Sequence, residues 1–135
     1  MIVIGTAQGK AVLTKIPGSD TGDENDPFPI EFKPKQARSC TVIGFNPVLY
    51  NQFFTGLEKV KNDACLQVWD ITTEAPKVKG RRQIASVEEP LRSFSPGEQV
   101  ISATWFPSSP HLLAAGTSTK FVRLYDVRSM CPLHC

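Results

Sequence analysis

The sequence predicts an all-β fold built from repeated units of short antiparallel strands. The chain resembles itself at a spacing of about 60 residues, which is typical of repeat architectures. Its 11 prolines and 9 glycines interrupt the apolar runs at matching places in each unit. No window longer than about ten residues has apolar side chains at helical spacing. With 135 residues, of which 41% are hydrophobic, the chain can bury a core.

The first unit is a partial one. Gly5–Ile16 aligns without a gap on Gly116–Val127, so we expect residues 1–16 to form the end of one repeat. Residues 17–28 have no counterpart elsewhere and are expected to be a loop insert. Asp20–Glu31 holds five acidic residues and no basic one, which is typical of a solvated segment.

Two fuller repeats follow, over residues 38–71 and 99–128. In each, an apolar strand ends in an aromatic residue, then any residue, then Pro47 or Pro107. A proline cannot continue a ladder of hydrogen bonds, so the first strand should end there. We expect residues 72–89, which separate the two repeats, to be a second loop insert.

Later landmarks divide each repeat further. Gly56 and Gly116 should close the second strand, where the backbone must turn. The third strand ends in an aromatic–aspartate pair, which is Trp69-Asp70 in one repeat and Tyr125-Asp126 in the other. Two weaker segments are expected to be fourth strands, namely Pro29–Lys33 and Pro90–Phe94.

The third strand of the second repeat is apolar on both faces. Leu66 and Val68 point one way, whereas Cys65 and Trp69 point the other. A sheet with two apolar faces must be covered on both sides, and a stack of small sheets, as in propeller blades, provides that cover.

The order of these landmarks resembles the WD repeat. Trp69-Asp70 is the signature dipeptide of that family, and Tyr125-Asp126 is a variant of it. The resemblance implies an incomplete WD-repeat β-propeller of about two and a half blades, with Trp69 packed between strands and Asp70 bonded to turn amides. The Gly-His that precedes the first strand in the family is missing from both repeats, so its hydrogen-bond network with Trp and Asp is in question here.

A closed propeller needs at least four blades, so this chain is not expected to close alone. It has the organisation of a fragment that begins and stops within repeats. The edge strands that it exposes should make the isolated polypeptide self-associate or dissolve poorly.

Four segments resemble the N-terminal propeller of the Mio (missing oocyte) family, namely residues 5–14, 31–47, 112–116 and 123–128. Members of that family are scaffold subunits of the GATOR/SEA assembly, which relays amino-acid status to TOR complex 1 at the lysosome or vacuole. The resemblance implies a non-catalytic binding role without cofactor or small-molecule substrate. It also implies other WD-repeat and solenoid subunits as partners, and a cytoplasmic location that extends to the lysosomal or vacuolar membrane surface.

Two alternatives remain open, a peptide-binding WD module of another complex and a propeller that binds acidic lipids. The second rests on four basic residues within the 72–89 insert, which could meet lipid headgroups or a partner's carboxylates. These residues are Lys77, Lys79, Arg81 and Arg82. A solvated loop is the plainer interpretation of the same cluster.

The sequence gives no support for catalysis, metal binding or nucleic-acid binding. His111 and His134 are the only histidines, and no phosphate loop, nucleophile elbow or metalloprotease motif is present. Cys131, His134 and Cys135 lie close in sequence, but a zinc site needs four ligands, and Cys40 and Cys65 do not form a spaced pair. The net charge of +2 excludes a strongly basic nucleic-acid binder.

Overall fold

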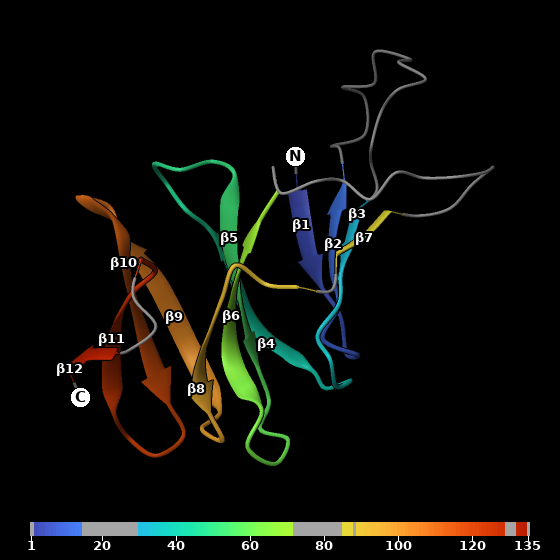
Figure 1. Cartoon of the computed structure of the whole chain (residues 1–135). Coiled ribbons are helices and arrows are strands. Elements are labelled where there is room, and N and C mark those ends of the chain that lie inside the picture. The colour runs from blue at the N-terminus through green and yellow to red at the C-terminus, as the bar shows by residue number, and fades with distance from the viewer. Residues whose placement is uncertain (1, 15–29, 72–84, 88, 129–131, 135) are drawn as a thin grey trace.

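The chain folds into three small β-sheets that stand side by side (Figure 1). The computed structural model describes residues 2–14, 30–71, 85–87, 89–128 and 132–134. Within these residues every regular element is a strand, so the predicted all-β fold of an incomplete propeller is confirmed. We name the sheets A, B and C in chain order.

Sheet A contains four strands in the order β1-β2-β3-β7. Their bounds are Ile2–Gly5 for β1, Ala11–Thr14 for β2, Ile30–Phe32 for β3 and Ala85–Val87 for β7. The first three strands pair antiparallel, whereas β7 runs parallel to β3. The structure therefore differs from the expectation of a loop throughout 72–89, because β3 offers an open backbone edge to which the end of this segment returns.

Sheets B and C are antiparallel throughout. Sheet B has the order β4-β5-β6-β8, with bounds Cys40–Phe45, Gln52–Leu57, Ala64–Asp70 and Arg92–Pro96. Sheet C has the order β9-β10-β11-β12, with bounds Val100–Phe106, Ser109–Thr117, Val122–Asp126 and Pro132–His134. The expected fourth strand at Pro90–Phe94 thus forms as β8, displaced slightly toward the C-terminus.

The strand registers repeat from sheet to sheet. In each sheet, the glycine near the end of one strand pairs with the first paired residue of the next strand. These pairs are Gly5–Ala11, Gly56–Leu66 and Gly116–Val122. Residues that align in sequence between the first and the last unit therefore also occupy equivalent positions in their sheets. The four extra residues of the second repeat lengthen the turn between β5 and β6.

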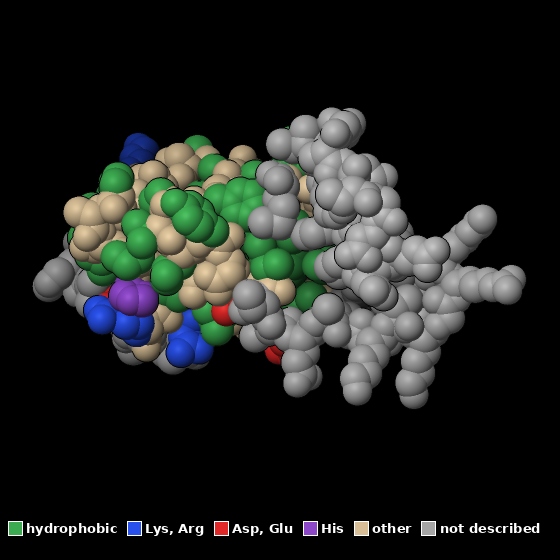
Figure 2. Space-filling model, turned by 90° about the horizontal axis from the view of Figure 1, so that it is seen from above, with side chains coloured by type: hydrophobic (Ala, Val, Ile, Leu, Met, Phe, Trp, Pro, Cys, Tyr) green, Lys and Arg blue, Asp and Glu red, His purple; other side chains and the backbone are tan. Residues whose placement is uncertain are grey.

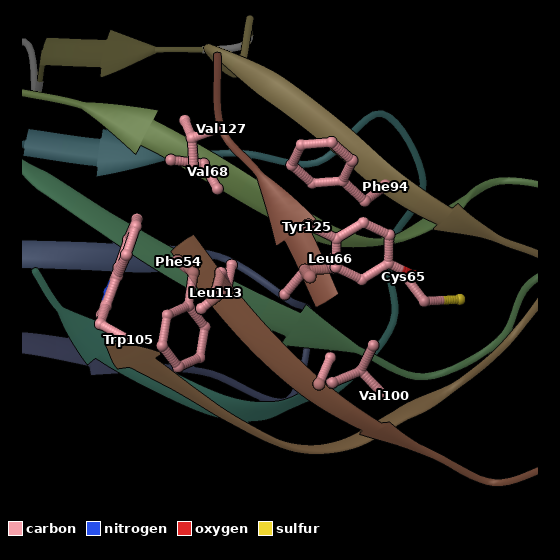
Figure 3. Close-up of a cluster of buried hydrophobic side chains, with 11 residues drawn as sticks. Phe54, Cys65, Leu66, Val68, Phe94, Val100, Trp105, Leu113, Tyr125 and Val127 are labelled. Carbon is pink, nitrogen blue, oxygen red and sulfur yellow. The ribbon is translucent and has the colours of Figure 1, made fainter. Parts of the chain in front are cut away.

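Two hydrophobic cores separate the three sheets. The core between sheets A and B contains Ala11, Leu13, Ile30, Phe32, Phe53 and Trp69. The core between sheets B and C gathers Phe54, Leu113 and Trp105 near one another and stacks Phe94 on Tyr125 (Figure 3). Because side chains alternate along a strand, consecutive Phe53 and Phe54 of β5 enter opposite cores. Sheet B is therefore shared by both.

Hydrogen bonds between sheets reinforce the core between B and C. The Thr41 hydroxyl donates to the carbonyl oxygen of Val100 over 2.7 Å. The Trp105 indole N–H donates to the carbonyl oxygen of Gly44 over 3.1 Å. These bonds satisfy backbone oxygens at β4 and β9, the first strands of sheets B and C, where the two sheets contact each other. We call β4 and β9 the inner strands.

Candidate functional site

Trp69 and Asp70 each make a side-chain hydrogen bond within or next to sheet B, and Trp69 is buried. The Trp69 indole N–H donates to the Thr55 hydroxyl over 3.0 Å, and the ring packs edge-on to Phe32. Asp70 Oδ1 accepts a bond of 3.1 Å from the Asn51 side-chain amide, in the turn that begins β5. In this repeat, which lacks the family's histidine, the Trp69 indole N–H therefore has the Thr55 hydroxyl as its partner.

The equivalent pair in sheet C uses different partners. Tyr125 is buried and stacks on Phe94, with ring centroids 4.7 Å apart. Asp126 forms a two-point ion pair with Arg128, at 2.8 and 3.1 Å. The side-chain and backbone hydrogen bonds from Arg128 lower the pKa of Asp126 to about 2.

Gly56 and Gly116 lie within paired strands, and neither closes a strand by a left-handed turn. Strand β5 continues to Leu57 and β10 to Thr117. A Cβ atom at Gly56 would lie 2.5 Å from a methyl carbon of Val42, and one at Gly116 would lie 2.9 Å from the Ser102 hydroxyl oxygen. These glycines permit the close approach of the inner strand's side chains.

Pro47 and Pro107 follow the inner strands, as expected, and the residue before Pro47 has a role that the sequence analysis missed. Asn46 is fully buried, and its Oδ1 accepts the backbone N–H groups of Val48 and Leu49, each over 3.0 Å. Its side-chain amide donates to the carbonyl oxygen of Pro110 over 2.7 Å. An Asn-Pro pair is a turn signal, but its bond to the neighbouring sheet has no local signature.

This clamped turn presents two large apolar side chains to solvent. Val48 is 47% exposed and Tyr50 is 75% exposed. The turn lies on the same side of the molecule as the β9–β10 turn, uppermost in Figure 1. Figure 2 looks at this side, over which hydrophobic side chains gather with Lys and Arg along one margin. Tyrosine is among the residue types enriched at the energetically important positions of protein interfaces.

A second feature is a cleft of about 320 Å³ beside sheet B, lined among others by Lys35, Gln67, Leu91 and Arg92. The buried Arg38 lies next to it, donates to the carbonyl oxygen of Ala64 and lies 3.3 Å from an Asp63 carboxylate oxygen. Arg38 belongs to the segment between β3 and β4, so this contact ties that segment to the start of β6. No motif in the sequence marks Arg38 for this role.

Several candidate residues lie outside the described part of the chain. These are the four basic residues of the insert, Lys77, Lys79, Arg81 and Arg82, and also Cys131 and Cys135. His134 belongs to β12. In the described ranges, no three His, Cys, Asp or Glu residues gather as metal ligands would. Cys40 and Cys65 are free thiols whose pKa values are raised by burial. The same ranges contain no helix that could span a membrane.

The comparisons with known proteins agree on one family. The model of the MIOS WD40 repeat matches residues 1–132. The chain is similar to a GATOR2 complex protein MIOS of Dictyostelium discoideum, with 25% identity over 96% of the chain and 14% of the relative. The corresponding values are 29%, 96% and 16% for GATOR2 complex protein MIOS-A of Xenopus laevis. They are 30%, 95% and 13% for GATOR2 complex protein Mio of Drosophila melanogaster.

Proposed function

The chain belongs to the family of MIOS WD40-repeat proteins, and we propose that it acts as a non-catalytic interaction scaffold in a GATOR2 complex. The observation that carries the proposal is the match to this family over residues 1–132. The strand pairing that repeats from sheet to sheet agrees with it. The chain spans only 13–16% of the length of these three relatives, so a scaffold role for the whole protein is part of the proposal.

Several polar side chains of the chain bond within or between the sheets, which supports a non-catalytic role. Trp69 bonds to Thr55, Asp126 to Arg128 and Asn46 to Pro110, all within or between sheets. Each of these groups maintains the fold, which is what a rigid binding platform requires. The proposed partners are other WD-repeat and solenoid subunits of the same complex. The proposed role is amino-acid signalling to TOR complex 1, from the cytoplasm and at the lysosomal or vacuolar surface.

We place one contact of this scaffold on the turn that Asn46 clamps. Tyr50 offers a large rigid side chain with a polar tip, and the turn that carries it is already ordered, so little conformational entropy is lost on binding. A Tyr50→Asp substitution adds a charge at a 75% exposed position and should weaken capture of partners without unfolding sheet B. Tyr50→Phe keeps the ring and is the matched control.

The test is affinity capture of the tagged protein at its natural expression level, followed by mass spectrometry. We expect GATOR2 subunits to co-purify with the wild type and with Tyr50→Phe, and several-fold less with Tyr50→Asp. A wild type that brings no such subunit would overturn the scaffold proposal. Equal capture by all three variants would remove the turn from the interface and leave the scaffold standing. Flotation with acidic vesicles, using an Arg81→Glu and Arg82→Glu variant, tests the lipid-binding alternative.

A further inference from the structure

The cleft beside sheet B lies over the paired strands β6 and β8. Residues 89–93, which lead into β8 and begin it, line the cleft together with Asp63, Ala64 and Gln67 at β6. Lys35, from the segment between β3 and β4, also lines it (Figure 1). Because five of these residues are consecutive, the cleft follows the course of the chain into β8. Such an outline fits an elongated ligand better than a compact one.

Gln67 brings a buried hydrogen-bond acceptor to this cleft. Its side chain is almost fully buried, and its Oε1 accepts no hydrogen bond. Side chains alternate along β6, so Gln67 lies on the same face as Trp69, which packs in the core between sheets A and B. A buried acceptor that stays unpaired is costly, so a group that donates to Gln67 Oε1 contributes more than an ordinary surface hydrogen bond.

Unpaired polar atoms concentrate around the cleft. In the described ranges six buried side-chain polar atoms lack a hydrogen-bond partner, and five of them belong to residues that line the cleft or to Arg38 beside it. These five are Asp63 Oδ2, Gln67 Oε1, Arg92 Nε, and Nε and Nη1 of Arg38. Donors and acceptors therefore lie together here, which points to a ligand that offers both.

The charges of the lining favour neither an anion nor a cation. Its basic residues are Lys35 and Arg92, and its acidic residues are Asp63 and Glu89. An anion would meet the two carboxylates, and a cation would meet the two bases. A neutral group with one donor and one acceptor avoids both conflicts. The peptide unit of a main chain is such a group, since it carries one N–H and one carbonyl oxygen.

We propose that this cleft binds an extended peptide segment of a partner protein, with a main-chain N–H of that segment donating to Gln67 Oε1. Ala64, Pro90 and Leu91 supply apolar lining for a small aliphatic side chain of the same segment. At about 320 Å³ the cleft lies at the lower end of ligand pockets, so it holds a few residues of the partner. The site adds to the scaffold role proposed above and does not depend on it.

A display library of random peptides tests the proposal on the 135-residue chain. The library is first depleted on Gln67→Met, which keeps the length of the side chain but removes the acceptor, and is then selected on the wild type. Depletion removes peptides that bind elsewhere on the molecule. We expect the remaining peptides to bind the wild type about tenfold more tightly than Gln67→Met. N-methylation of one peptide amide, the one that donates to Gln67, should cause a similar loss.

Two further variants locate the binding site. Gln52→Met is the matched control, because Gln52 Oε1 is also buried and unpaired but lies on β5 outside the cleft. It should bind the selected peptides as the wild type does. Ser93 pairs with Gln67, so their side chains share a face, and Ser93→Leu should fill the cleft while keeping the acceptor. We expect Ser93→Leu to weaken binding by about the same factor as Gln67→Met. Urea unfolding checks that each variant is folded.

Three outcomes would overturn the proposal. The library could retain no binder after depletion, which would leave the cleft to water. The selected peptides could bind Ser93→Leu as tightly as the wild type, or Gln52→Met could lose them equally, and in either case the cleft is not their site. Capture of GATOR2 subunits is a separate measurement, so each of these failures is distinguishable from a failure of the scaffold role.

Discussion

At the scale of single residues, the Trp69–Thr55 hydrogen bond satisfies the buried indole N–H in a repeat that lacks the family's histidine. Both residues are buried, and the indole N–H has this hydroxyl as its partner. Thr55→Val keeps the shape of the side chain but leaves the N–H unpaired, so we expect a loss of about 1–3 kcal/mol in unfolding free energy. Urea unfolding followed by tryptophan fluorescence measures it. Thr55→Ser keeps the hydroxyl and should cost distinctly less; equal losses would mean that the bond is not the cause.

Asp126 should make the stability of the chain depend on acidic pH. Its pKa is about 2 in the folded chain against an ordinary value of 3.8, because Arg128 bonds to the ionised carboxylate. A lowered folded pKa contributes stability that is complete above the unfolded value and is lost as pH falls through the folded one. We therefore expect stability to drop between about pH 4 and pH 2.

The Asp126→Asn variant tests this dependence. It should be less stable than the wild type at neutral pH and should lose less stability between about pH 4 and pH 2. Some acid sensitivity should persist, because the pKa of Glu98 is also lowered in the folded chain. Burial alone would raise this pKa, but hydrogen bonds from Thr119 and Arg123 lower it. Denaturant midpoints measured across this pH range would contradict the assignment if the two proteins changed in parallel.

At the scale of elements, β7 joins sheet A although its segment connects two strands of sheet B. The Lys33 amide N–H donates to the carbonyl oxygen of Val87 over 2.9 Å. Alternate residues of a strand direct their backbone groups to opposite edges, so Val87 faces β3 and the Ser86 N–H points away. Val87→Pro keeps the carbonyl that accepts from Lys33 but removes the backbone N–H that Val87 directs toward β3, so it should loosen this edge, whereas Ser86→Pro should be tolerated.

Hydrogen exchange distinguishes the two β7 variants. We expect the Lys33 amide to lose protection in Val87→Pro and to keep most of it in Ser86→Pro. Only the first variant removes an N–H that is directed at β3, and a backbone hydrogen bond contributes about 1 kcal/mol. Val87 also packs against the core between sheets A and B, so a modest loss of overall stability should accompany the first variant. Unchanged protection in both variants would mean that β7 does not hold Lys33.

The strands of the repeats were predictable because Pro47, Pro107 and the aromatic–aspartate pairs recur at fixed places in the sequence. β7 was not predictable, because its segment has no counterpart in the other units. The two glycines lie one residue before the ends of their strands, but the close approach of Val42 to Gly56 was not predictable, since it depends on which strand lies alongside. The bonds of Asn46 and Arg38 were missed for the same reason. A local pattern shows which strands exist, whereas contacts between strands appear only when they are assembled.

At the scale of the whole molecule, sheet B belongs to both cores, so we expect the chain to unfold as one unit. Strand β5 sends Phe53 into the core with sheet A and Phe54 into the core with sheet C. Losing sheet B would expose both cores at once, although sheets that contact only their neighbours can also unfold stepwise, as in repeat proteins. The two tryptophans distinguish these cases, since Trp69 lies in the first core and Trp105 in the second.

Each tryptophan can be observed alone in a variant that replaces the other, namely Trp105→Phe or Trp69→Phe. In each variant, we expect the fluorescence transition in urea to coincide with the loss of far-ultraviolet circular dichroism, because one cooperative step removes both the local core and the strands. The conservative replacements lower the midpoints but do not alter this coincidence within a variant. A fluorescence transition of the Trp69-only protein that precedes its circular dichroism change would show that sheet A detaches first, and that sheets B and C form the more stable half of the stack.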